Sequence, residues 1–155
     1  MSEKLKVGIL GGTGMVGQRF ISLLENHPWF EVTTIAASPR SAGKTYAEAV
    51  GDRWKMDTPM PEAVKNIVVM NVNEVEKVAS EVDFVFSAVD MTKDEIKKIE
   101  EEYAKTETPV VSNNSAHRWT PDVPMVVPEI NPEHMEVIKY QKERLGTTRG
   151  FVAVK

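Results

Sequence analysis

The sequence predicts an α/β fold in which a mostly parallel, doubly wound sheet carries helices on both faces. Short β-rich apolar segments alternate along the chain with amphipathic helical segments. This alternation is typical of strand–helix–strand units, whose strands run parallel and whose helices cover the sheet. Polar loops follow several of the expected strands, and 155 residues are the usual size of one domain.

The first half of the chain is expected to alternate strand, helix, strand and loop. These elements are predicted at residues 6–11, 14–26, 30–37 and 38–45, and His27-Pro28 is expected to end the helix. The stretch 46–66 is the least readable because Pro59 and Pro61 interrupt any long element. Strands are then predicted at 67–70 and 83–88, with a short helix at 74–80 between them.

The second half opens with the clearest helix start in the chain. Thr92 and Glu95 have the spacing of a capping box, and Met91 and Ile96 have that of a hydrophobic staple. Strands are expected at 109–112 and 150–154, with a further short one at 125–127. Between the last two, Asn131-Pro132 is predicted to cap and open a helix that ends at Gly146.

Composition excludes several classes of function. The net charge of −4 argues against a polyanionic partner such as nucleic acid. The first residues lack the apolar core of a signal peptide, and no apolar run approaches a membrane span, so we expect a cytoplasmic protein. The absence of cysteine excludes disulfides and any thiol nucleophile within this chain. The three histidines are too dispersed to predict a metal site.

A glycine-rich turn follows the first expected strand and opens the first helix. It contains Gly11, Gly12, Thr13, Gly14, Met15, Val16 and Gly17, which match both G-x-G-x-x-G and G-x-x-G-x-x-G. In this context glycines permit a tight turn and a close approach of the backbone to a pyrophosphate, while the helix start supplies free N–H groups. The pattern indicates a Rossmann-like dinucleotide site. The alternative is a tight turn that binds no ligand.

The loop after the second expected strand favours NADP over NAD. NAD sites usually place an acid there for the ribose 2′-hydroxyl, but no acid occurs between Glu31 and Glu48. Ser38, Arg40 and Ser41 instead offer hydroxyls and a guanidinium that suit a 2′-phosphate. A solvated basic loop is the alternative interpretation.

A second polar loop, residues 112–118, follows another expected strand at the same edge of the sheet. Its amides, hydroxyls and the guanidinium of Arg118 form a set that suits a small anion. A surface salt bridge is an equally good explanation of Arg118. His117 fits a hydrogen-bonded structural residue better than a catalyst.

Taken together, these segments resemble the aspartate-semialdehyde dehydrogenase family in its archaeal and fungal-like branch. The resemblance rests on GGTGMVGQRF, AASPRSAGK, FSA, SNNSAHRWTPDVPMVVPEIN and GFVAVK, in family order, and covers essentially all of residues 1–155. It implies that the chain is the NADP-binding domain of a reductase of L-aspartyl-4-phosphate. That reaction consumes NADPH and yields L-aspartate 4-semialdehyde and phosphate, on the route to lysine, methionine and threonine.

The resemblance also implies roles for individual residues. It assigns the pyrophosphate turn to Thr13, Gly14, Met15 and Val16, within the glycine turn bounded by Gly11 and Gly17. It assigns the 2′-phosphate contacts to Ser38, Arg40 and Ser41, and a backbone passing near the cofactor to Ser87 and Ala88. It assigns the substrate phosphate to Asn114 and Arg118.

The departure from the family pattern concerns catalysis. In the family the nucleophilic cysteine lies in an Asn-Cys motif just after the strand that GFVAVK resembles, and this chain ends at Lys155, before that motif. The later histidine base, the carboxylate-binding arginine and the dimerising substrate domain are also missing. We therefore expect a domain of a homo-oligomeric enzyme that binds NADP without turnover and contains no catalytic residue of its own.

Three alternatives remain open at this stage. The cofactor domain of malonyl-CoA reductase is similar, and N-acetyl-glutamyl-phosphate reductase shares mainly the glycine turn. A non-catalytic NADP-binding module is the third. A domain taken from a larger enzyme should expose apolar side chains where its partner domain packs, whereas an independent module should have a hydrophilic surface.

Overall fold

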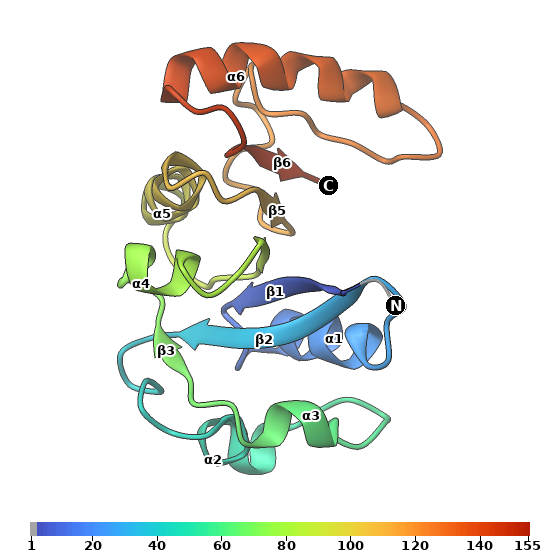
Figure 1. Cartoon of the computed structure of the whole chain (residues 1–155), viewed down its shortest axis with the longest axis vertical. Helices are drawn as coiled ribbons and strands as arrows, with labels where there is room; N and C mark the ends of the chain where they lie inside the picture. The colour runs from blue at the N-terminus through green and yellow to red at the C-terminus, as the bar shows by residue number, and fades with distance from the viewer. Residues whose placement is uncertain (1–2) are drawn as a thin grey trace.

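The computed structural model describes residues 3–155 and contains one six-stranded sheet (Figure 1). The strand order is β3-β2-β1-β4-β5-β6, and every neighbouring pair is parallel. The strands are β1 (Leu5–Leu10), β2 (Phe30–Ala37), β3 (Met70–Asn71), β4 (Phe84–Ser87), β5 (Val110–Ser112) and β6 (Val152–Val154). The predicted Rossmann-like, doubly wound fold is confirmed.

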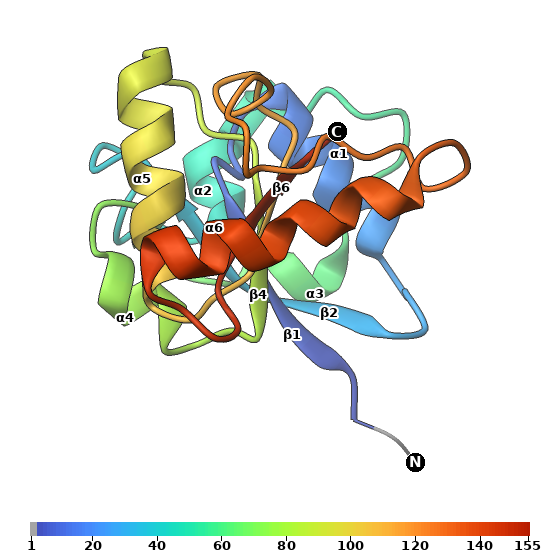
Figure 2. The same cartoon turned by 90° about the horizontal axis from the view of Figure 1, so that it is seen from above.

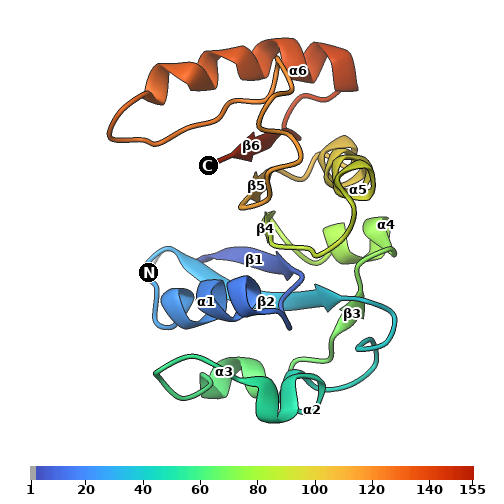
Figure 3. The ribbon, with the colours of Figure 1, turned by 180° about the vertical axis from the view of Figure 1, so that it is seen from behind.

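Two apolar clusters cover the two faces of this sheet. The first joins the strands to α1 (Met15–Leu24), α2 (Tyr46–Val50) and α3 (Glu62–Lys65) through buried side chains such as Ile21 and Val64. The second joins them to α4 (Val75–Ala79) and α5 (Lys93–Lys105) through Val78 and Ile99. Figures 2 and 3 show the two groups of helices from above and from behind. No helix within residues 3–155 combines the length and apolarity that a membrane span requires.

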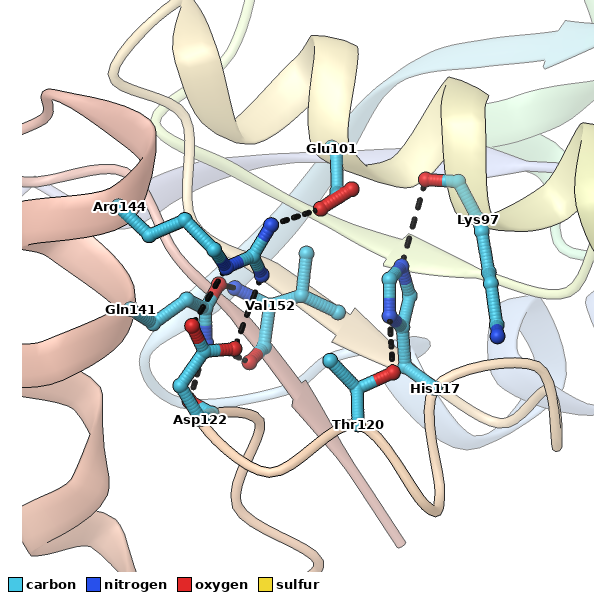
Figure 4. Close-up of polar contacts among 8 residues, drawn as sticks. All are labelled: Lys97, Glu101, His117, Thr120, Asp122, Gln141, Arg144 and Val152. Carbon is cyan, nitrogen blue, oxygen red and sulfur yellow. Dashed lines mark hydrogen bonds and ion pairs between the residues drawn. The ribbon is translucent and has the colours of Figure 1, made fainter.

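The edge strand β6 is held by side chains of α6 (Ile138–Leu145), which lies beyond it in Figure 1. The buried amide of Gln141 accepts a hydrogen bond from the Val152 N–H (2.7 Å) and donates to the Val152 carbonyl (2.9 Å). One turn later, Arg144 binds both carboxylate oxygens of Asp122 and one of Glu101 on α5 (Figure 4). The Gln141 bonds satisfy backbone groups that the edge strand β6 would otherwise leave unpaired, and the Arg144 ion pairs join α6 to Asp122 and to α5.

Helix boundaries confirm the strongest sequence signals. The Thr92 hydroxyl accepts from the Glu95 N–H and the Glu95 carboxylate accepts from the Thr92 N–H, which completes the capping box of α5. Gly146 ends α6 in the left-handed conformation, with φ of 72°. The first helix ends at Leu24, earlier than the position of Pro28 predicted. Asn26, just after its end, has the left-handed backbone conformation with φ of 58°.

Three expectations were wrong in detail. The strand expected at 67–70 is limited to Met70–Asn71, because Val68 forms an isolated antiparallel bridge with Thr45 instead. The strand expected at 125–127 is only an isolated bridge of Met125. The helix expected after Asn131 begins as the 3₁₀ segment η2 (Pro132–Val137), and Asn131 does not cap it. Its side-chain amide is used in the preceding loop, where it bonds the backbone of Val127 and Met125.

Candidate functional site

The glycine turn between β1 and α1 is shaped by close backbone packing. Gly11 has φ of 79°, and a Cβ there would lie 2.5 Å from the carbonyl oxygen of Ala88. A Cβ on Gly17 would collide with the carbonyl oxygen of Gly11. The buried Tyr46 hydroxyl donates to the Gly12 carbonyl at 2.8 Å, and burial raises the pKa of this phenol. The fold itself therefore requires glycine at positions 11 and 17.

Gly14 differs from its neighbours because nothing in the fold excludes a side chain there. Its backbone is extended, with φ of −79° and ψ of 172°, and the nearest atom to an added Cβ is the Gly11 carbonyl oxygen at 3.8 Å. The residue is exposed at the N-terminus of α1. Packing does not require glycine at position 14, but the missing side chain lets a ligand approach the backbone closely.

The N-terminus of α1 also presents unpaired donors. Gly14 is its N-cap and offers no side-chain hydrogen bond, and the first turn contains no acid. The first N–H groups of a helix have no partner within the helix, and the helix dipole adds positive potential there. A bare, acid-free start of a ten-residue helix therefore suits a phosphate group.

These features border a cleft of about 340 Å³ at the carboxyl edge of the sheet. It is lined by Gly11, Thr13, Gly14, Ala37, Ser38, Arg40, Arg53, Val72, Ala88, Val89, Asp90 and Met91. The loops after β1, β2 and β4 meet here, as parallel strands in this order predict. One cleft thus contains the backbone of the glycine turn, the uncapped N-terminus of α1 and the two guanidinium groups of Arg40 and Arg53, and this combination fits a dinucleotide.

The cleft brings together about half of the predicted cofactor residues. Gly11, Thr13, Gly14, Ser38, Arg40 and Ala88 line it, whereas Met15, Val16, Gly17, Ser41 and Ser87 do not. Met15 and Val16 are exposed on the first turn of α1, and Ser87 is fully buried. The buried Ser41 shapes its loop through its N–H, which donates to the Ser38 carbonyl at 3.0 Å. The cofactor roles of these residues stay predictions.

Sequence reasoning missed several residues that line the cleft. Val89, Asp90 and Met91 follow β4 directly, so the rule for strand ends that indicated Ala88 applies to them as well. Arg53 had no such signal, because it lies in the stretch 46–66 that has no regular pattern. Its guanidinium bonds the carbonyls of Val50 and Ala49 at 3.3 and 2.5 Å.

Arg40 is exposed and forms no ion pair with any residue between 3 and 155. It follows the end of β2 in the same loop as Ser38, and both face the cleft. An uncompensated guanidinium beside a hydroxyl is a suitable pair of donors for a phosphate. The one acid that lines the cleft, Asp90, comes from the loop after β4 and not from the β2 loop, where NAD sites usually place it.

The loop after β5 is organised around a buried carboxyl group. Glu100 of α5 is fully buried, and its Oε2 accepts from the Ser112 hydroxyl (2.6 Å) and the Asn114 amide (3.0 Å). The same Asn114 amide also lies 3.2 Å from the Ser87 hydroxyl. Asn114 therefore directs its NH₂ group into the interior, toward β4 and α5. Its backbone N–H donates to the Ser112 hydroxyl at 2.9 Å, so Asn114 has no free donor in this arrangement. The predicted contact with a substrate phosphate would require the NH₂ group to turn away from Glu100, and it stays a prediction.

His117 and Arg118 are neighbours with opposite surroundings. His117 is buried, with Nδ1 3.0 Å from the Thr120 hydroxyl and Nε2 3.3 Å from the Lys97 carbonyl (Figure 4). A carbonyl only accepts, so Nε2 carries the proton and the ring has a structural role. Arg118 is exposed and forms no ion pair within the described chain. The surface salt bridge considered for it is absent there, and its phosphate role stays a prediction.

A second cavity is larger than this cleft but is a poorer candidate for the functional site. It has a volume of about 940 Å³, lies between α4 and α5 and is lined mainly by charged side chains such as Glu74 and Lys105. It is open to solvent and contains none of the predicted site residues. Within residues 3–155, no three or more His, Asp or Glu side chains are placed so that they could hold a metal ion.

Comparison with known proteins gives one consistent result. Residues 6–138 match the family model described as semialdehyde dehydrogenase, NAD binding domain. The chain is 46% identical over 148 residues to the aspartate-semialdehyde dehydrogenase of Methanothermobacter thermautotrophicus, which covers 96% of this chain and 40% of that protein. The corresponding Aspergillus fumigatus protein is 45% identical over 149 residues, covering 96% and 39%.

Solved structures agree with these relatives. The aspartate-semialdehyde dehydrogenase of Candida albicans, solved with NADP, superposes with a TM-score of 0.84 at 41% identity, covering 98% of this chain and 42% of that one. The chain thus spans about 40% of the length of the curated relatives it matches. Because the family model covers most of its length, the chain belongs to the semialdehyde dehydrogenase family and carries the NAD-binding domain of that family.

Proposed function

We propose that residues 1–155 form the NADP-binding domain of an aspartate-semialdehyde dehydrogenase. The observation that carries this proposal is the single cleft in which the bare start of α1 faces Arg40 and Ser38. The helix start suits the pyrophosphate and the β2 loop suits the 2′-phosphate. The relatives named above, which are aspartate-semialdehyde dehydrogenases of an archaeon and of fungi, support the same assignment.

The whole enzyme, on this proposal, reduces L-aspartyl-4-phosphate to L-aspartate 4-semialdehyde, with NADPH as the hydride donor. Arg118 and Asn114 hold the phosphate of the substrate. This chain has no cysteine, so by itself it binds the cofactor without forming a covalent acyl intermediate. The intact enzyme works as a cytoplasmic homo-oligomer. Exposed apolar side chains at Trp119 and Ile130, which are 89% and 77% accessible, suit packing against a further domain.

Calorimetric titration of this chain with NADP⁺ and NAD⁺ tests the cofactor assignment. We expect a preference for NADP⁺ that falls about 10- to 100-fold in Arg40→Ala, the range for losing one charge-assisted contact. Arg149→Ala removes the same charge from a loop at the opposite edge of the sheet and should leave the preference unchanged. Equal affinity of the unmutated chain for both cofactors would refute the assignment.

The substrate class is tested on the full-length protein. Turnover with an acyl phosphate and none with an acyl-CoA thioester is the expected result. Activity only with malonyl-CoA would replace the proposed reaction with that of malonyl-CoA reductase and would leave the NADP assignment intact.

A further inference from the structure

Arg53 is a second guanidinium in the cofactor cleft, and it comes from a part of the chain with no recognisable motif. It lies in the short 3₁₀ segment η1 (Gly51–Arg53), directly after α2. The lining of the cleft includes it together with Thr13, Ser38 and Arg40. A cation therefore lies near the predicted phosphate contacts without having been expected there.

The backbone of Arg53 is fixed directly to the glycine turn. The buried side chain of Gln18, in the second turn of α1, donates from Nε2 to the Thr13 carbonyl and to the Arg53 carbonyl, both at 3.0 Å. Its Oε1 accepts from the Lys55 N–H at 2.9 Å. One buried amide thus ties residues 53–55 to the turn that opens the cleft. Movement of Arg53 away from the glycine turn would break this network.

The guanidinium is oriented without being neutralised. Its Nε and Nη2 donate to the Val50 and Ala49 carbonyls, which are neutral acceptors that define the plane of the group. Its Nη1 donates to no residue between 3 and 155, and no carboxylate in that range pairs with it. Arg53 is exposed, so the free part of its guanidinium is open to an anion from outside the chain.

The charges that line the cleft show what Arg53 adds. Arg40 and Asp90 cancel formally, so the lining is net positive only because of Arg53. A 2′-phosphate is close to a dianion at neutral pH, and one guanidinium beside an acid does not balance it. The pyrophosphate, by contrast, is served by the neutral N–H groups at the start of α1.

We propose that Arg53, which lines the same cleft as Arg40, is a second specificity-determining residue for the 2′-phosphate of NADP. This inference rests on the proposed function. It extends the adenosine-side contact beyond the β2 loop to the segment after α2. It also gives a reason for the otherwise unexplained fixation of residues 53–55 by Gln18.

Titration of Arg53→Gln with NADP⁺ and NAD⁺ is the test. We expect NADP⁺ affinity to fall about 10-fold, with NAD⁺ affinity within about 2-fold of the unmutated chain. Arg149→Gln is the matched control for charge. An equal loss for both cofactors, or no loss for NADP⁺, would overturn the proposal, because the first indicates a pyrophosphate or purely structural role.

Arg53→Lys keeps the charge but not the planar fork, and it keeps the test valid if Arg53→Gln does not fold. Its ratio of affinities for adenosine 2′,5′-bisphosphate and 5′-AMP should fall about 3-fold, with less loss than in the glutamine variant. An unchanged ratio in the lysine variant would contradict the proposal. If the unmutated chain binds no NADP⁺, the proposed function fails as well. If Arg40→Ala loses the preference and the Arg53 variants keep it, only this inference fails.

Discussion

The helices α1 and α5 follow neighbouring parallel strands, yet they begin in opposite ways. Helix α5 satisfies its own first N–H groups through the Thr92–Glu95 capping box and adds Asp94 to its first turn. Helix α1 begins at Gly14, without a side-chain cap and without an acid. A protein optimised for stability alone would cap both. The difference fits the proposed function, in which the start of α1 is left open for an external anion, whereas the start of α5 is closed by its own side chains.

In a third region, free backbone N–H groups bind a carboxylate of the chain itself. Glu107, just beyond α5, accepts hydrogen bonds from the backbone N–H groups of Thr148, Arg149 and Gly150. These donors lower the pKa of Glu107 to about 2. On the proposed function, backbone N–H groups bind an anion in both places, and at α1 the anion comes from outside the chain.

The largest effect should come from giving α1 the kind of start that α5 has. Gly14→Asp adds a capping carboxylate at a position where the fold has room for a side chain. We expect cofactor affinity to fall by about 100-fold or more, because a carboxylate would repel the pyrophosphate at the helix start. The melting temperature should stay the same or rise, since aspartate is at least as good an N-cap as glycine.

Titration calorimetry and thermal unfolding of Gly14→Asp measure the two effects separately. Gly17→Ala is the contrasting variant, because its Cβ would collide with the Gly11 carbonyl oxygen and should destabilise the fold itself. If Gly14→Asp still bound NADP⁺ with unchanged affinity, the start of α1 would not be the pyrophosphate site, and the contrast with the capped start of α5 would have no functional meaning.

The converse change in α5 should affect stability and leave binding unchanged. Thr92→Ala removes the capping hydroxyl and should lower the free energy of unfolding by about 1 kcal/mol. Denaturant unfolding gives this value, and the affinity for NADP⁺ should not change. Thr92→Ser keeps the cap and serves as the control. A loss of cofactor affinity in Thr92→Ala would show that α5 contributes to the site.

The smallest effect is expected at Glu107, because its carboxylate lies at the surface and glutamine retains one acceptor oxygen. The pKa of Glu107 is lowered in the folded chain from 4.5 to about 2, so its charge stabilises the fold above about pH 4.5 and less as the pH falls toward 2. Glu107→Gln should therefore lower the melting temperature at pH 7. The difference from the unmutated chain should shrink at pH 3, and a difference that grows would contradict this account.

Local signals in the sequence predicted most of the fold. The alternation of segments predicted the parallel sheet, and the Thr92–Glu95 spacing predicted the start of α5. Prediction failed where a local preference competes with a partner outside the expected helix or strand. Asn131 has the features of an N-cap, but its amide bonds the backbone of Val127 and Met125. Val68 lies in a β-rich segment, but it pairs with Thr45 from a loop.

For the site, the sequence by itself determined the glycine turn, the missing acid after β2 and the presence of Arg40, because those features are contiguous in the chain. Only the tertiary structure decided that Arg53 and Asp90 line the same cleft, that Asn114 directs its NH₂ group toward Glu100, and that Gly14 alone among the turn glycines has free space. The physical reason is that side-chain direction and free volume depend on atoms from segments far apart in the chain.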